Sequence, residues 1–177
     1  MPLFGRSVRF LTPFVLAVIV ALTIQATVAR LYEVRQSSME RTLSEGDVLL
    51  GERLTPRFGT LSHGDVVIFS VTTGPFAGQP LVKRVVALPG DTVELRDGVV
   101  FRNGRPLDEP YINSFAGRTD PLVAGATSWL LAEGTYFLIG DHRDGSVDSR
   151  AFGPVPLTAI EARVMFRVSP FGGFDAP

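Results

Sequence analysis

A run of uncharged, mostly apolar residues near the N-terminus is the longest hydrophobic feature of the chain. Residues 10–29 contain no charged side chain. A helix of about 20 residues spans roughly 30 Å, the hydrocarbon thickness of a bilayer. Arg6 and Arg9 precede the run, and basic residues also follow it, so the flanking charges only weakly favour a cytoplasmic N-terminus. We therefore predict a transmembrane anchor at 10–29, with residues 1–9 on the cytoplasmic side.

Two other interpretations of this segment remain open. Thr27-Val28-Ala29 resembles the small-residue cleavage site of a secretory signal peptide, with Arg6 and Arg9 as its basic region. A buried core helix is the second alternative. The apolar run is longer than the roughly 7–15 residues usual in a signal peptide, which favours a retained anchor.

Beyond residue 35 the pattern changes to short apolar or alternating runs separated by turn signals. Asp97-Gly98 and Asn103-Gly104 lie between alternating segments, where such pairs predict tight hairpins. No stretch after residue 30 has helical periodicity over ten residues, and 106–128 reads as an irregular excursion. The predicted strands are 47–50, 65–69, 81–88, 92–96, 99–102, 136–139 and 162–168.

These elements predict a mainly β protein. We expect an N-terminal transmembrane helix followed by a catalytic β domain at 30–177, built on a coiled or barrel-like sheet. A small β annex is expected to be inserted at about 92–135.

The amino-acid composition excludes several kinds of chemistry. The chain has 177 residues, no cysteine, two histidines and a formal net charge of −1. Disulfides and thiolate metal sites are therefore excluded, a histidine-rich metal centre is disfavoured, and nothing in the charge points to nucleic acid.

A serine and a lysine are the candidate reactive residues. Ser38 follows the apolar run closely, and Lys83 lies within the apolar run 81–86. A lysine can activate a serine when it is neutral, and burial lowers an ammonium pKa from about 10.4 by up to roughly 3–5 units. Strand alternation turns Lys83 and Arg84 to opposite faces, so the second cation need not enter the site.

Four segments in order resemble bacterial type I signal peptidases, the membrane-bound serine proteases that remove signal peptides from exported proteins. Residues 38–43 match S-M-x-P-T-L except at Arg41. Residues 64–69 and 83–91 match two further motifs, and 140–150 match G-D-N-R-D-N-S-x-D-S-R at all but two fixed positions.

The resemblance implies that Ser38 is the nucleophile and Lys83 its general base. The Ser38 backbone N–H is the implied first oxyanion donor. The family's second donor is a serine hydroxyl two residues before the nucleophile. Here that position is Gln36, whose side-chain amide is a candidate replacement.

Further roles follow position by position. Ser146 is expected to orient the lysine, Asp148 and Arg150 to form a supporting ion pair, and Asp144 to hold the same loop. Shallow pockets should admit the small residues at −1 and −3 of an A-x-A cleavage site. The residues that match those pockets are Val34, Met39, Leu43, Leu81 and Val82.

Asp141 and His142 raise a competing possibility, a Ser-His-Asp triad with Ser38 or Ser146 as nucleophile. Against this, His142 occupies an asparagine position of the resembled family, and Asp141 is its immediate sequence neighbour.

The leading functional expectation is a signal-peptide-cleaving endopeptidase in the inner or plasma membrane, single-pass, with its catalytic domain on the extracytoplasmic side. Its expected partners are the signal peptides of exported preproteins and the lipid bilayer. Cofactors, nucleic acid and an obligate oligomer are not expected. The alternatives are a dedicated maturation peptidase for one exported or conjugation-related client, and a non-catalytic, membrane-anchored peptide-binding β domain.

Overall fold

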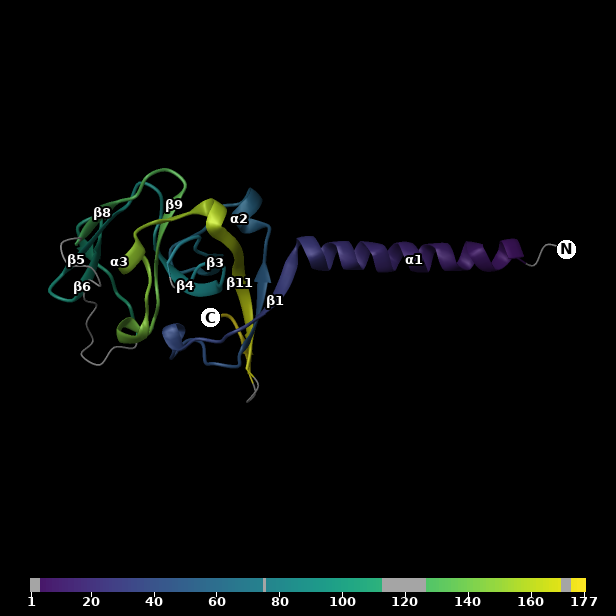
Figure 1. The fold of residues 1–177 in the computed structure, drawn as a ribbon, viewed down its shortest axis with the longest axis horizontal. Helices are drawn as coiled ribbons and strands as arrows, with labels where there is room; N and C mark the ends of the chain where they lie inside the picture. Colours follow the sequence, from purple (N-terminus) through teal and green to yellow (C-terminus); the bar gives the residue numbers. More distant parts are fainter. Residues whose placement is uncertain (1–3, 75, 113–126, 170–172) are drawn as a thin grey trace.

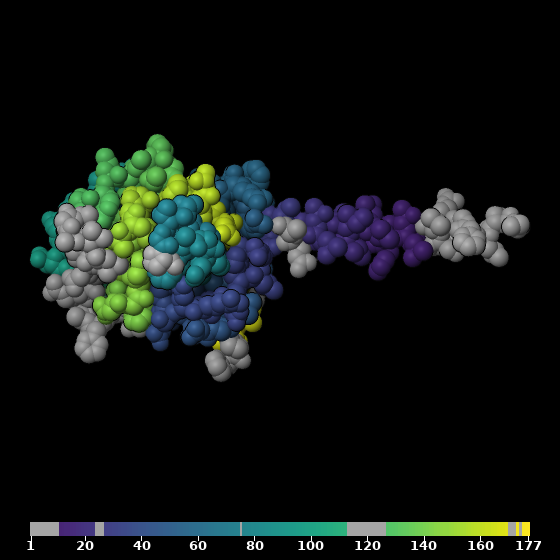
Figure 2. All heavy atoms as spheres, viewed as in Figure 1, coloured from purple at the N-terminus to yellow at the C-terminus, as the bar shows by residue number. Residues whose placement is uncertain are grey.

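A long helix projects from a β body in the computed structural model, which describes residues 4–74, 76–112, 127–169 and 173–177 (Figure 1). Helix α1 (Phe4–Thr27) extends away from the β body, and its residues 11–23 stand clear of the rest of the molecule in the space-filling view (Figure 2). The helix ends two residues before the predicted end of the anchor, because Ala29 already pairs with Glu52 in the sheet.

The described side chains of α1, at residues 11–23 and 27, are exposed, with Leu11 at 58% and Phe14 at 68% of their full accessibility. The buried-core-helix alternative is therefore wrong. Among the described residues, no helix satisfies both the length and the apolarity required of a membrane span.

An eight-stranded antiparallel sheet forms most of the β body and curls into a half-barrel. Two register shifts in the longest strand, near Ile160 and Val164, are bulges of the kind that bend a sheet. Seven strands lie in the spatial order β1 (Ala29–Glu33), β2 (Val48–Glu52), β11 (Ile160–Val168), β3 (Val66–Ser70), β4 (Pro80–Ala87), β9 (Thr135–Ile139) and β10 (Val155–Pro156), with β12 (Phe174–Asp175) beside β11.

A second sheet lies between β4 and β9 in chain order, within the residues where the annex was predicted. Its four strands are ordered β7 (Arg105–Pro106), β6 (Val99–Arg102), β5 (Thr92–Arg96) and β8 (Ser128–Leu130). Asp97 and Asn103 have φ values of 52° and 54°. Each is followed by a positive-φ glycine, so the predicted Asp-Gly and Asn-Gly hairpin turns are confirmed.

Two parts of the 106–128 excursion differ from the irregular structure that was predicted, because Pro106 belongs to β7 and Ser128 opens β8. Residues 113–126 lie outside the described part.

Alternation along the strands divides the core between the two faces of the main sheet. In β3, Val67 and Phe69 join one hydrophobic cluster, whereas Val66 and Ile68 join another. A third cluster packs the annex against the ends of β4 and β9.

In the described part of the chain, five short helical turns connect strands, and each is too short to show the periodicity that predicts a helix. They are η1 (Ser37–Met39), α2 (Thr55–Phe58), η2 (Arg143–Gly145), α3 (Ser149–Phe152) and η3 (Leu157–Ala159).

Candidate active site

The structure brings Ser38 and Lys83 into direct contact. Ser38 lies in the 3-10 turn η1, only 7% exposed, and Lys83 lies in β4, 1% exposed. Their side-chain atoms, Nζ and Oγ, are 2.6 Å apart. The ammonium also donates to the Val82 carbonyl, at 3.0 Å. A base within this distance can take the hydroxyl proton directly.

Burial lowers the pKa of Lys83 to about 8. The negative charge of Asp148 acts against this change and raises the lysine pKa, whereas the positive charge of Arg150 lowers it. Near neutral pH a usable fraction of the lysine is therefore neutral, as general-base chemistry requires.

Lys83 and Arg84 point to opposite faces of β4, as predicted from strand alternation. Leu81 and Val85, on the Lys83 face, belong to one core cluster, and Val82 packs against the other. The Arg84 guanidinium forms a two-pronged pair with Asp141, with N–O distances of 3.0 and 2.7 Å. The Asp141 carboxylate therefore compensates the charge of this second cation on the face of β4 opposite Lys83.

Asp148 is the hub of the loop that follows β9. Its carboxylate accepts hydrogen bonds from Arg150 Nε (2.8 Å), the Gly140 amide (3.0 Å) and the Ser146 hydroxyl (2.6 Å). The predicted Asp148–Arg150 ion pair is present and almost fully buried. Because every polar group here has a partner, the loop is held in one arrangement.

In the structure the Ser146 hydroxyl is bonded to Asp148, and its role in orienting Lys83 stays a prediction. Its one hydroxyl proton goes to Asp148, a charged and therefore stronger acceptor than an amine. The hydrogen bonds of Lys83 go to Ser38 and Val82, and a bond to Ser146 is not among those made by the described residues. Ser146 is thus linked to the dyad through Asp148 and through packing.

Gly140 has no room for a side chain. A Cβ at this position would overlap Ser146 Oγ and lie 2.5 Å from the carbonyl oxygen of Ser38. The His142 amide donates to that same carbonyl, at 3.1 Å. The nucleophile and the Asp148 loop therefore meet at a position that only glycine fits.

A Ser-His-Asp triad is not formed. Asp141 is bound by Arg84 and by Thr42 rather than by a histidine. The His142 ring nitrogen Nδ1 lies 3.1 Å from the Ser37 carbonyl oxygen and 3.6 Å from Glu40. The other predicted loop residue, Asp144, is exposed in η2, outside the Asp148 hub, and its structural role stays a prediction.

Gln36 lies half-buried in extended conformation immediately before η1, with φ −138° and ψ 145°. It borders the same hollows as Ser38. Neither its side-chain amide nor the Ser38 N–H is used in a hydrogen bond within the described part of the chain. Two donors are thus available beside the nucleophile.

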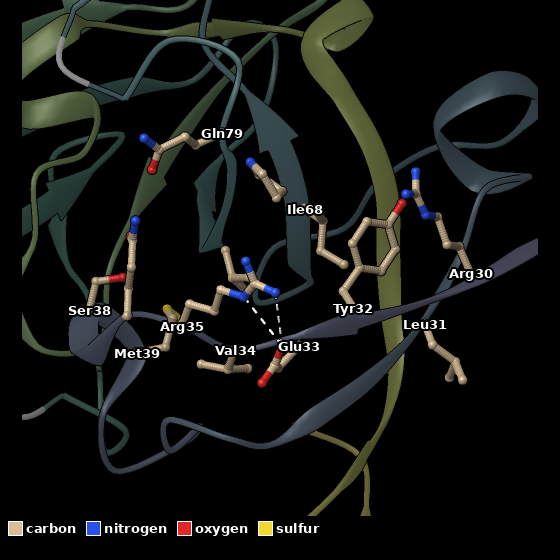
Figure 3. A pocket seen from close by; sticks show the side chains of 13 residues that line it. Arg30, Leu31, Tyr32, Glu33, Val34, Arg35, Ser38, Met39, Ile68 and Gln79 are labelled. Atoms are coloured by element: carbon tan, nitrogen blue, oxygen red, sulfur yellow. Dashed lines mark hydrogen bonds and ion pairs between the residues drawn. The ribbon is translucent and has the colours of Figure 1, made fainter.

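Two hollows meet at Ser38, Gln36 and Arg35, with volumes of about 370 Å³ and 330 Å³. Of the predicted pocket residues, Val34, Met39 and Val82 line the first and Leu81 lines the second. Figure 3 shows Val34, Met39 and Ser38 around the first hollow. Leu43 lines neither, because it is fully buried in the core.

Sequence reasoning missed eight further residues that line the first hollow, namely Arg30, Leu31, Tyr32, Glu33, Arg35, Ile68, Gln79 and Pro80. The alternation that selects Val82 also selects Pro80, and Ile68 is the cross-strand partner of Val82. Knowledge of the β3–β4 register would have identified both.

The first part of β4 is paired on one side only. Residues 80–83 pair with β3, from Ser70 opposite Pro80 to Val67 opposite Lys83, whereas pairing with β9 begins at Arg84. Within the described residues, the second edge of 80–83 is open beside the hollows. An open edge of this kind can take an extended peptide as an added strand.

Arg41, which replaces the family proline, has φ 88°. A proline ring holds φ near −65°, so the turn after the nucleophile has a backbone that proline cannot adopt. The Arg41 side chain reaches the Ile112 carbonyl, with N and O 2.8 Å apart.

Among the described residues, no group of three or more His, Asp or Glu side chains is arranged to hold a metal ion.

Known proteins match this chain over most of its length. The family described as signal peptidase, peptidase S26, matches residues 7–169. A probable signal peptidase I-1 of Synechocystis is 34% identical over 159 residues, covering 87% of this chain and 78% of the relative. A signal peptidase I of Bacillus caldolyticus is 33% identical over 172 residues, covering 92% and 91%. A crystal structure of a signal peptidase I from Enterococcus faecalis V583 shares 31% identity with a TM-score of 0.46, covering 59% of this chain and 96% of that one.

Proposed function

Since the chain belongs to the signal peptidase family, peptidase S26, and is a serine endopeptidase that cleaves signal peptides, we propose that Ser38 and Lys83 carry out the reaction. The contact of 2.6 Å between Lys83 Nζ and Ser38 Oγ is the observation that supports this most directly. The lysine pKa of about 8 supplies the neutral amine that the reaction needs.

In this proposal, neutral Lys83 takes the hydroxyl proton while Ser38 Oγ attacks the scissile carbonyl carbon. The resulting tetrahedral oxyanion is stabilised by the Ser38 N–H and by the Gln36 amide. The Lys83 ammonium then gives its proton to the departing amine of the mature protein, which leaves an acyl ester on Ser38. Neutral Lys83 next takes a proton from water, and the hydroxide releases the signal peptide and regenerates the serine.

The substrate is proposed to bind extended along the open edge of residues 80–83. Main-chain hydrogen bonds would hold it there, and alternate side chains would enter the hollows beside Ser38. The lining of Val34, Met39 and Val82 is apolar and close to the nucleophile, which suits small residues at −1 and −3.

Residues 10–29 are proposed to anchor the enzyme in the cell membrane, with the catalytic domain outside the cytoplasm. The supports are an uncharged apolar sequence and the position of α1, which leaves the β body without packing its described side chains into it. An anchor ending at Thr27 would hold Ser38 near the membrane surface, where signal peptides emerge.

The test is cleavage of a preprotein with an A-x-A site by the purified full chain. We expect Ser38→Ala and Lys83→Ala to lose essentially all activity while remaining folded, because each removes one reactant of the proton transfer. Thr60→Ala, an exposed position, is the matched control. Activity retained by either dyad variant would contradict the assignment.

The non-catalytic alternative is wrong, since the chain is an endopeptidase. No observation favours the alternative of a single dedicated client.

A further inference from the structure

One short segment of the annex contacts three arginines, which come from three different parts of the active site. The segment is residues 109–112, here called the clasp. Arg41 follows the nucleophile by three positions, Arg84 is the neighbour of the general base, and Arg143 opens the loop that carries the Asp148 hub. Each of these arginines binds a different group of the clasp.

The contact with Arg143 is the most buried. Its guanidinium holds the Glu109 carboxylate with two hydrogen bonds of 3.0 and 2.7 Å, and the Arg143 side chain is 1% exposed. The same side chain donates to the Gly140 carbonyl, at 3.1 Å. Removing one partner of a buried charge pair leaves the other charge without compensation, so this pair fixes where the loop begins.

The contact with Arg84 is a stacked one. The guanidinium carbon lies 4.2 Å from the centre of the Tyr111 ring, and the Tyr111 hydroxyl donates to Glu109, at 3.0 Å. Burial raises the pKa of Tyr111, so its hydroxyl keeps the proton that it donates. The Arg84 guanidinium is therefore held between the Tyr111 ring and the Asp141 carboxylate. Because Arg84 is adjacent to Lys83 in β4, this restricts the position of the β4 backbone beside the lysine.

The third contact joins the nucleophile turn to the end of the clasp. Arg41 donates to the Ile112 carbonyl, at 2.8 Å. The four residues of the clasp therefore contact three segments that are distant in sequence. In the described structure, no hydrogen bond joins the clasp to Ser38 or Lys83 themselves.

We propose that the clasp is a positioning element, in which Glu109 and Tyr111 set the alignment of the nucleophile turn, the base strand and the Asp148 loop. The inference rests on the proposed function of Ser38 and Lys83. Errors of about 1 Å in the placement of reacting groups can lower a rate by about 10²-fold, so contacts that fix this alignment are contacts that affect turnover.

A defined path leads from the clasp to the lysine. The Arg143 carbonyl accepts a hydrogen bond from Arg150, at 2.8 Å, and Arg150 neutralises Asp148. Glu109→Gln removes the negative charge that compensates the buried Arg143 guanidinium, so the charge balance at this junction becomes more positive. More positive surroundings disfavour the ammonium form of Lys83.

The experiment measures kcat, KM and the pH midpoint of kcat/KM for the full chain with a preprotein substrate. The variants are Glu109→Gln, Tyr111→Leu and the conservative Tyr111→Phe. Asp108→Asn is the matched control, because this exposed neighbour loses the same charge outside the clasp. The single tryptophan, Trp129, packs on Phe137 with ring centres 4.7 Å apart, so its fluorescence reports the folded fraction.

For Glu109→Gln and Tyr111→Leu we expect kcat per folded molecule to fall at least about tenfold, with KM changed less than about threefold. Tyr111→Phe keeps the stacked ring and should recover most of that loss. The pH midpoint should move downward in Glu109→Gln and stay constant in Asp108→Asn.

Losses below tenfold per folded molecule, or losses that match the unfolded fraction, would overturn the proposal. An unmoved pH midpoint in Glu109→Gln would equally overturn the path through Arg143 and Arg150. If Glu109→Gln does not fold, the Tyr111 pair decides by the same criteria. A failure of the dyad assignment is recognised separately, since Ser38→Ala would then retain activity.

Discussion

At the scale of single residues, the burial of Lys83 couples stability to function. Burial takes its pKa from 10.5 to about 8, which corresponds to roughly 3 kcal/mol at 1.36 kcal/mol per unit. Below pH 8 the lysine is protonated in both the folded and the unfolded chain, so the folded state carries the full cost of the buried ammonium. Between pH 8 and 10.5 the folded chain binds fewer protons, and stability rises with pH.

The first prediction concerns activity against pH. Because only neutral Lys83 accepts the serine proton, kcat/KM should rise about tenfold per pH unit at acidic and neutral pH and level off near pH 8. Initial-rate measurements on a preprotein between pH 5 and 9 give the profile. A midpoint near 10.5, the ordinary value for lysine, would mean that burial does not lower the pKa in the working enzyme.

A second prediction is that Lys83→Met, although inactive, is more stable than the natural chain. Methionine fills a similar volume without a charge, so unfolding at neutral pH should cost up to roughly 3 kcal/mol more. Denaturant titration at pH 7 measures the gain, and a repeat near pH 10.5 is the control, where the gain should largely disappear. Equal stability at pH 7 would contradict the argument.

A third prediction is that Gly140→Ala lowers both activity and stability. The new methyl group would displace either Ser146 or the Ser38 carbonyl, and we expect activity to fall by about 10² or more. Stability should fall by about 1–3 kcal/mol, as for other overpacked sites. Gly59→Ala is the control, since its nearest neighbour would be 3.3 Å away and it lies outside the site. Full activity of Gly140→Ala would show that the loop has more freedom than the packing indicates.

At the scale of elements, the turn after Ser38 departs from the family pattern in its backbone as well as in its side chain. We expect Arg41→Pro, which introduces the family residue, to lower activity at least about tenfold, because φ 88° is closed to proline. Arg41→Gly is the matched variant, since glycine accepts this conformation. Cleavage rates for both decide the matter: an Arg41→Pro enzyme as active as Arg41→Gly would show that the turn readily adopts the other conformation.

The elements that sequence predicted are those with local signals. The strands with alternating or β-branched runs, and the Asp97 and Asn103 hairpins, formed where expected because their patterns depend only on neighbouring residues. Strands β1 and β8 had no such pattern, and partners distant in sequence create them. In the site, Ser38 and Lys83 could be predicted from the resemblance to a known family. The hydrogen bond from Ser146 to Asp148 could not, because it depends on which acceptor lies nearer in space.

At the scale of the whole molecule, the long-range contacts could not be read from the sequence. The Arg143–Glu109 and Arg84–Tyr111 contacts join the annex side to the active site, but each residue alone resembles an ordinary charged or aromatic position. Two buried guanidinium groups in one loop-and-strand junction require a preformed arrangement of partners. The annex therefore supplies the groups that bind these two arginines.

The last prediction concerns how the whole chain is placed at the membrane. The chain contains no cysteine, so a single introduced cysteine is its only thiol. We expect a membrane-impermeant maleimide to label Arg57→Cys, an exposed position of helix α2, in intact spheroplasts, because the proposed orientation puts the β body outside the cytoplasm. Arg6→Cys, before the apolar run, should be labelled only after lysis. Both variants should stay with the membrane after carbonate extraction, since about 20 apolar residues bind a bilayer too strongly to be washed off. Release by carbonate would contradict the anchor, and labelling of Arg6→Cys before lysis would contradict the orientation.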